Sequence, residues 1–170
     1  MKKWKIALIG MMSISLTACW KSSYEFEGKY FLAEGDECTV PSSPRDRDQY
    51  FLEITYQAQD GTKRYTAKLP IASMMGAPIS SNESSSPTDN NELTFKFSKD
   101  EKSGFFSGTP GVDIVISVIP NKTKKDYIWI KKFDSTIVQK GKIKEFSMVD
   151  SLRETKKVGS KGICLRKLLT

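Results

Sequence analysis

Histidine is absent from this chain of 170 residues. Because histidine is the usual general base and a frequent metal ligand, its absence excludes Ser-His-Asp and Cys-His catalytic systems and histidine metal sites. The sequence also contains no Walker loop, dinucleotide-binding fingerprint or EF-hand pattern. We interpret the acidic residues around Asp36 and Asp46 as solvated loop charges rather than as an acid and base pair. The sequence therefore predicts no enzymatic activity, no metal ion and no cofactor.

The apolar stretch near the start of the chain is too short to be a permanent membrane span. It covers eleven residues, 6–16, and follows Lys2, Lys3 and Lys5. A helix needs about 20 apolar residues to cross a bilayer. A basic start followed by a short apolar run is typical of a targeting segment that is removed from the mature protein.

This stretch ends in Leu16, Thr17, Ala18 and Cys19, which resembles the lipobox of bacterial lipoprotein signal peptides at all four positions. The resemblance implies that residues 1–18 are a signal peptide that is removed, that the Cys19 sulfur receives a diacylglyceryl group and that the freed amine is acylated. Two or more acyl chains make membrane attachment stable. Membrane lipid, held through acylated Cys19, is thus the first expected partner.

The residue after the cysteine indicates which membrane holds the protein. In lipoproteins of this kind an Asp at that place retains the protein in the inner membrane, and here the residue is Trp20. The resemblance therefore implies the outer membrane, facing the periplasm. Residues 19–23 form the lipidated cysteine and a short tether, whose four residues after Cys19 reach about 14 Å. Residues 24–170 are expected to form a single periplasmic domain close to the membrane.

Most of that domain alternates apolar and polar residues with a period of two, which is the pattern of strands with one buried face. Asp60 and Gly61 lie between two such runs and predict a hairpin turn. The sequence predicts an all-β fold, an antiparallel small barrel or sandwich of about seven to nine strands. The alternating runs are residues 24–32, 50–57, 64–71, 92–97, 112–119 and 127–133, with weaker candidates at 137–138, 143–148 and 163–168.

Three segments depart from this alternation. Residues 147–157 could form one short helix, with Ser147 or Asp150 as its cap. Residues 76–91 are rich in Ser, Asn and Pro, and predict a mobile loop rather than a domain boundary because strands lie on both sides. A turn over 99–104 and the apolar pair at 105–106 suggest a second hairpin.

Two cysteines, Cys38 and Cys164, remain once Cys19 is lipidated. In an oxidising compartment they are expected to form a disulfide. Such a bond would close a long loop and restrict the unfolded chain by about 4 to 5 kcal/mol in the chain-entropy model. The rival interpretations, a metal pair or a catalytic thiol, lack a histidine or further cysteines.

Charge is distributed unevenly along the chain. Residues 92–170 contain 17 Lys and Arg against 9 Asp and Glu, whereas residues 20–91 contain 7 against 11. The expected periplasmic location argues against nucleic acid as the partner of these basic residues. Anionic lipid headgroups or an acidic protein remain as candidate partners. The alternative is a solvated lysine face that keeps the protein soluble. The candidate binding face consists of Lys131, Lys132, Lys142 and Lys144.

Two classes of function follow from these features. The first is a structural or interaction protein of the cell envelope, an accessory subunit or a periplasmic inhibitor, that holds a protein partner through a strand edge or the lysines. The second is a carrier of a small hydrophobic ligand. Gly28, Lys29 and Tyr30 are weakly similar to the Gly-x-Trp opening of lipocalins, with Tyr30 in place of the tryptophan. A carrier requires a dry cavity inside the barrel.

Overall fold

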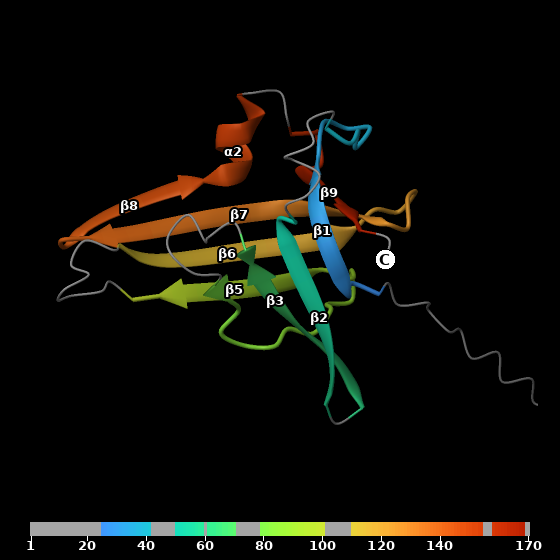
Figure 1. Ribbon diagram of the computed structural model, residues 1–170, viewed down its shortest axis with the longest axis horizontal. Coiled ribbons are helices and arrows are strands. Elements are labelled where there is room, and N and C mark those ends of the chain that lie inside the picture. Colours follow the sequence, from blue (N-terminus) through green and yellow to red (C-terminus); the bar gives the residue numbers. More distant parts are fainter. Residues whose placement is uncertain are drawn as a thin grey trace, which may run out of the picture.

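The computed structural model describes residues 25–41, 50–59, 61–70, 79–100, 110–154 and 158–168. The prediction of an all-β fold with one short helix is confirmed (Figure 1). The strands are β1 (Gly28–Ala33), β2 (Leu52–Gln59), β3 (Thr62–Leu69), β4 (Ile79–Ser80), β5 (Leu93–Lys99), β6 (Gly111–Pro120), β7 (Tyr127–Gln139), β8 (Lys142–Ser147) and β9 (Ile163–Lys167), and the helix is α2 (Met148–Arg153).

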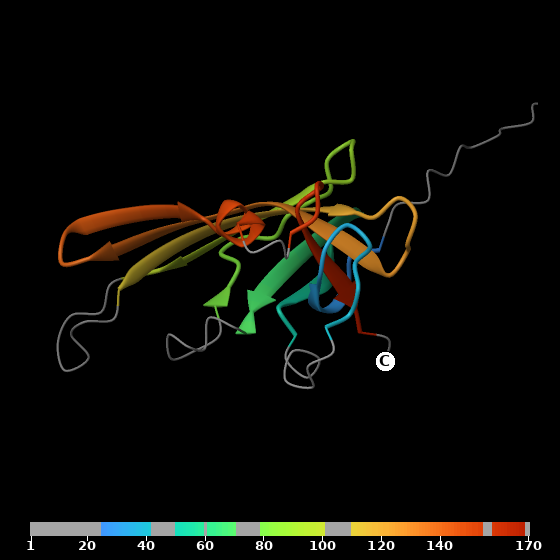
Figure 2. The same cartoon turned by 90° about the horizontal axis from the view of Figure 1, so that it is seen from above.

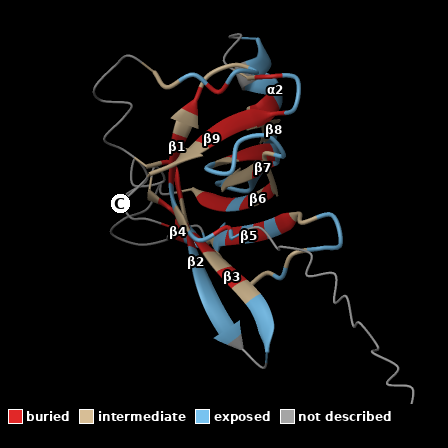
Figure 3. Ribbon diagram, turned by 90° about the vertical axis from the view of Figure 1, so that its right-hand side faces the viewer, coloured by how far each residue is buried: buried red, intermediate tan, exposed pale blue. Residues whose placement is uncertain are grey.

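Eight of the strands form a nearly closed antiparallel barrel in the order β4-β3-β2-β1-β9-β7-β6-β5. The last strand of the chain lies between the first and the seventh, so both ends of the domain are held in the same sheet. The β2–β3 hairpin turns at Gly61, as the sequence predicts, and the strand residues on both sides of the turn are exposed (Figure 3). The predicted hairpin at 105–106 lies outside the described residues.

The alternating side chains fill the interior of the barrel. Strand β5 shows the pattern plainly, because its odd-numbered residues from Leu93 to Phe97 are buried while the even-numbered ones are exposed. Burying such side chains stabilises the fold by roughly 1.5 to 3 kcal/mol each. The largest fully buried side chains are Phe26, Tyr30, Leu52, Ile54, Tyr65, Leu93, Phe95, Phe97, Ile116, Ile128, Ile130 and Ile163.

The segment that was predicted as the loop 76–91 helps to close the barrel. Ile79 is buried and belongs to β4, so the prediction of a segment without strands is wrong there. Ser85 exchanges two backbone hydrogen bonds of 2.7 Å with Tyr65 of β3. On the other side, the Asn82 N–H donates to the Lys96 carbonyl of β5 at 2.9 Å. The polar residues of this segment therefore connect β3 with β5.

Strand β7 is longer than predicted and extends beyond its pairing with β9, while it stays paired with β6 as far as Val138. Its thirteen residues include 137–138, which the sequence indicated as a separate strand. At about 3.3 Å per residue the strand spans about 40 Å. Strand β9 pairs only with its first four residues, whereas β8 pairs with residues 134–139. We call residues 134–147 the arm; Figure 2 shows this hairpin extending alongside β6, away from β9 and β1.

The predicted helix at 147–157 is present as α2 and ends at Arg153. The Asp150 N–H donates to the Ser147 hydroxyl at 3.4 Å, and the Ser151 hydroxyl donates to the Ser147 carbonyl at 2.9 Å. Val149 is buried and packs against the barrel core. Ser147 therefore caps the helix, as one of the two predicted candidates, and α2 covers the base of the arm.

Candidate functional site

The predicted disulfide is confirmed between Cys38 and Cys164, whose Cα atoms lie 5.6 Å apart. Both cysteines are buried, and they form a small second core with Ala33 and Trp129. Trp129 lies directly opposite Cys164 in the β7–β9 pairing. The bond therefore holds the loop that follows β1 over the outer face of β7 and β9.

A carboxylate reinforces this attachment. The Oδ1 atom of Asp36 accepts hydrogen bonds from the hydroxyl of Ser160 at 2.8 Å and from its backbone N–H at 2.6 Å. These hydrogen bonds lower the pKa of Asp36 below its ordinary value. Gly159 has no side chain at the point of contact, where a Cβ would lie 2.6 Å from the same oxygen. Asp36 thus has a structural role.

The connection between β6 and β7 lies at the end of the barrel where β1 begins. The Lys167 N–H donates to the Asp126 carbonyl at 2.7 Å, and the Leu168 N–H donates to the Lys29 carbonyl at 2.7 Å. The tip of the arm lies at the far end of the long strand β7 (Figure 1). The chain therefore enters the domain at the end opposite to the arm.

Lys131 and Lys132 lie at a β-bulge in β7. Ser117 pairs with Lys132 while the next residue of β6 pairs with Ile130, so Lys131 is the extra residue. The bulge leaves both lysine side chains about half exposed, at 50% and 54%. The two residues are therefore exposed together, as the sequence suggested.

Each of these two lysines already has a carboxylate partner. The Lys131 Nζ atom lies 3.9 Å from Glu92, and the Lys132 Nζ atom lies 3.1 Å from Asp134. Exposed pairs of this kind contribute at most about 1 kcal/mol to stability, but they reduce the net charge that a partner would meet. This half of the predicted face is therefore largely neutralised.

Lys142 and Lys144 lie on β8, on the other face of the sheet. Lys132 shares a face with Asp134, which lies two residues along the same strand. Lys144 lies opposite Ile137, and Ile137 points away from that face because it is three residues beyond Asp134. The prediction that the four lysines share one face is therefore corrected. Within the part of the chain that the structure describes, Lys142 and Lys144 form no ion pair.

The β7–β8 turn determines which backbone groups of β8 are exposed. Lys140 and Gly141 have φ angles of 50° and 73°, which are typical of a type I′ turn. Such a turn is closed by a hydrogen-bonded pair, here Gln139 and Lys142. Because the bonds of an antiparallel pair alternate, the N–H and C=O groups of Ile143 point away from β7. The same holds for Glu145, two residues later.

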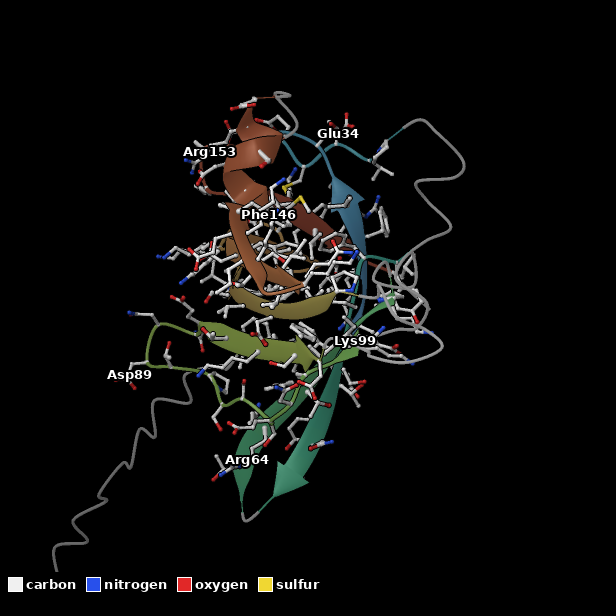
Figure 4. The ribbon with its side chains drawn as sticks, turned by 90° about the vertical axis from the view of Figure 1, so that its left-hand side faces the viewer. Glu34, Arg64, Asp89, Lys99, Phe146 and Arg153 are labelled. Atoms are coloured by element: carbon white, nitrogen blue, oxygen red, sulfur yellow. A yellow bond between two sulfur atoms is a disulfide. The ribbon has the colours of Figure 1, made fainter. Side chains whose placement is uncertain are left out.

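The outer edge of β8 is unpaired by any other described strand, since β8 pairs with β7 alone. Ile143 is 69% exposed, although its side chain is large and apolar. Figure 4 views the molecule from the arm side, with Phe146 on β8 below the helix. The sequence did not reveal this edge. The signal that could have revealed it is the Lys140-Gly141 pair between two short alternating runs.

The barrel interior bears on the carrier hypothesis. Tyr30, at the position similar to the lipocalin tryptophan, is fully buried, and its hydroxyl donates to the Phe26 carbonyl at 2.8 Å. A Cβ at Gly28 would lie 2.5 Å from the Lys167 side chain, so the start of β1 is closely packed. Tyr30 therefore belongs to the packed core, whereas the barrel fold itself is compatible with a carrier.

Comparisons with protein families, with curated proteins and with solved structures find no match to this chain. Among the described helices, none has the length and apolar character to span a membrane. The described residues also contain no cluster of three acidic or cysteine side chains suited to a metal ion. The candidate functional site is therefore the outer edge of the arm.

Proposed function

We propose that this chain is a lipid-anchored protein of the bacterial envelope that binds another envelope protein through the arm, as an accessory subunit or an inhibitor. The observation that carries the proposal is the outer edge of β8, which no other described strand covers. This edge exposes backbone hydrogen-bonding groups, Ile143 and two lysines that form no ion pair with a described residue. Strand edges of this kind are templates for pairing with another chain.

The position of the arm supports this role. The resemblance of residues 16–19 to a lipobox would place an acyl anchor within a few residues of the described chain, at the end of the barrel where β1 begins. The tip of the arm lies at the other end, about 40 Å along β7. An anchored molecule would therefore present the edge of β8 away from the membrane, where a periplasmic partner can reach it.

The proposal can be tested by photo-crosslinking in intact envelopes. A benzophenone amino acid replaces Ile143 at the exposed edge, and the matched control carries it at Thr55, which is exposed on the β2–β3 hairpin. We expect an adduct of one defined mass from position 143 and none from position 55. Adducts of equal yield from both positions, or none from position 143, would overturn the assignment of the arm.

A further inference from the structure

We infer that β8 binds an extended acidic segment of the partner as an additional strand. This inference rests on the proposed function and specifies the chemistry of the partner. The site is the outer edge of β8 with the side chains on either side of it, principally Lys142, Ile143, Lys144 and Glu145. All four residues are exposed.

The backbone of β8 supplies the first part of the recognition. Ile143 and Glu145 each direct one N–H donor and one C=O acceptor outward, as the register and the turn require. An extended peptide that lies along this edge can satisfy all four groups with its own backbone. β-strand addition gives affinity through such bonds, and the side chains on each face give specificity.

The lysines determine the charge of the added strand. Lys142 and Lys144 are two residues apart and therefore lie on the same face, roughly 7 Å apart along the strand. Opposite charges on adjacent strands stabilise strand pairing, and like charges oppose it. Because neither lysine has an ion pair within the described residues, both are available. A partner with carboxylates at alternate positions fits this face.

The face of β8 opposite to the two lysines is partly apolar. Ile143 lies directly opposite Val138 of β7, which is itself half-buried. A β-branched residue of the added strand would extend this pair to a third strand and cover Ile143. The preferred segment therefore alternates acidic residues on one face with β-branched residues on the other.

A second copy of this chain fits the edge poorly. When two β8 strands pair in antiparallel orientation, residues whose backbone groups face outward must oppose one another. If the two copies of Ile143 lie opposite each other, Lys142 of each copy lies opposite Lys144 of the other. If the register is centred on Lys144 or on Glu145 instead, that residue lies opposite its own copy. Like charges in direct opposition are destabilising. Edge lysines are a known protection against such self-association.

The test uses the full chain purified from membranes in detergent. The probe is a fluorescent, end-blocked peptide of alternating Glu and Val, and its counterpart has Lys in place of Glu. Binding is followed by fluorescence anisotropy. We expect the Glu-Val peptide to bind at least tenfold more tightly than the Lys-Val peptide. Equal affinity for the two peptides, or no binding of the Glu-Val peptide, would overturn the inference.

Two sets of variants locate the binding. Lys142→Glu combined with Lys144→Glu should reverse the preference between the peptides, whereas Lys131→Glu combined with Lys132→Glu should change either affinity by less than twofold. If only the variant with Lys131→Glu and Lys132→Glu bound the Glu-Val peptide more weakly, the binding site would lie elsewhere and the inference would be overturned.

The backbone contribution is tested by Glu145→Pro, which removes a donor that points away from β7 and so leaves the hairpin ladder in place. Glu145→Gln is the matched control that removes the charge but keeps the N–H. We expect Glu145→Pro to lower the affinity for the Glu-Val peptide at least tenfold. Glu145→Gln should leave this affinity unchanged or raise it. If Glu145→Pro unfolds, protection of the Ile143 amide from hydrogen exchange by the peptide replaces it, and unchanged exchange would contradict strand addition.

The two proposals fail separately. A crosslink from position 143 in envelopes together with no binding of the acidic peptide would discard the acidic strand and leave the interaction role in place. Binding of the acidic peptide to β8 without any crosslink in envelopes would leave the chemistry of the edge in place and discard the proposed function.

Discussion

The carboxylate of Asp36 receives two hydrogen bonds from Ser160, a residue 124 positions later in the chain. Together with the nearby disulfide, this contact attaches the loop after β1 to the segment that leads into β9. The order of the sheet explains its importance, because β9 lies between β1 and β7 and must be held in place for the barrel to close.

Removal of the Asp36 carboxylate should lower the stability of the barrel in a manner that depends on pH. Its pKa is lowered in the folded state, so the carboxylate stabilises the fold above its ordinary value of 3.8, and the contribution disappears as the pH falls through the lower folded value. We expect Asp36→Ala to melt at a lower temperature than the wild type at pH 7, with the difference shrinking as the pH falls below 3.8. Circular dichroism melts across this range provide the measurement. The control is Glu37→Gln, and a constant difference at all pH values would contradict the role of the carboxylate.

The same contact predicts that Gly159 cannot be replaced by alanine without cost. An added Cβ would lie 2.6 Å from Asp36 Oδ1 and 3.0 Å from the Asp36 Cα atom, so the loop must shift. We expect Gly159→Ala to destabilise the domain by about 1 to 3 kcal/mol. Denaturant unfolding of Gly159→Ala and of the double variant with Asp36→Ala measures the effect and its coupling. Strict additivity of the two substitutions would argue against a shared contact.

Loss of the disulfide should have a larger effect. The bond closes a loop with a sequence separation of 126 residues, and it lies in a buried cluster with Trp129. We expect replacement of both cysteines by serine to cost about 4 to 5 kcal/mol. Cys38→Ser alone should leave one free thiol at Cys164, which thiol titration under denaturing conditions will count. If wild type and double variant unfold at the same denaturant concentration, the bond does not stabilise the fold.

Acylation is predicted at Cys19 and at no other cysteine. Cys19→Ser should abolish incorporation of labelled fatty acid and release the protein from the membrane fraction, because the apolar stretch before it is too short to serve as an anchor. Cys38→Ser is the matched control and should keep the label. The measurement is acyl labelling followed by fractionation of the envelope. Undiminished labelling of the Cys19 variant would contradict membrane attachment through this residue.

The barrel could be predicted from the sequence because most of its strands bury one face, which leaves the alternation visible. The position at which strand β7 ends could not be predicted. The bulge at Lys131 and Lys132 inserts an extra residue, so two polar residues stand together and the alternation changes phase before Phe133. Strand β4 was missed because its two residues, Ile79 and Ser80, are too few to establish a period.

The division of the lysines between two faces has an equally physical reason. A two-residue turn pairs an even-numbered residue with an odd-numbered one, so Lys132 and Lys144 lie on opposite faces although both numbers are even. Sequence proximity could bring the lysines into one region but could not assign their faces. Only the register of β7 with β8 identifies Lys142 and Lys144 as the pair beside the open edge.

That register depends on the turn at Lys140 and Gly141. Gly141 has a φ angle of 73°, where a side chain is strained, so Gly141→Ala should destabilise the hairpin by about 1 kcal/mol. Lys140 has a φ angle of 50°, and Lys140→Asn should favour the same turn because asparagine tolerates this conformation. Hydrogen exchange of the Lys142 and Lys144 amides, which pair with β7, reports the opening of the arm. We expect faster exchange in Gly141→Ala and slower exchange in Lys140→Asn, and the opposite order would mean that another turn sets the register.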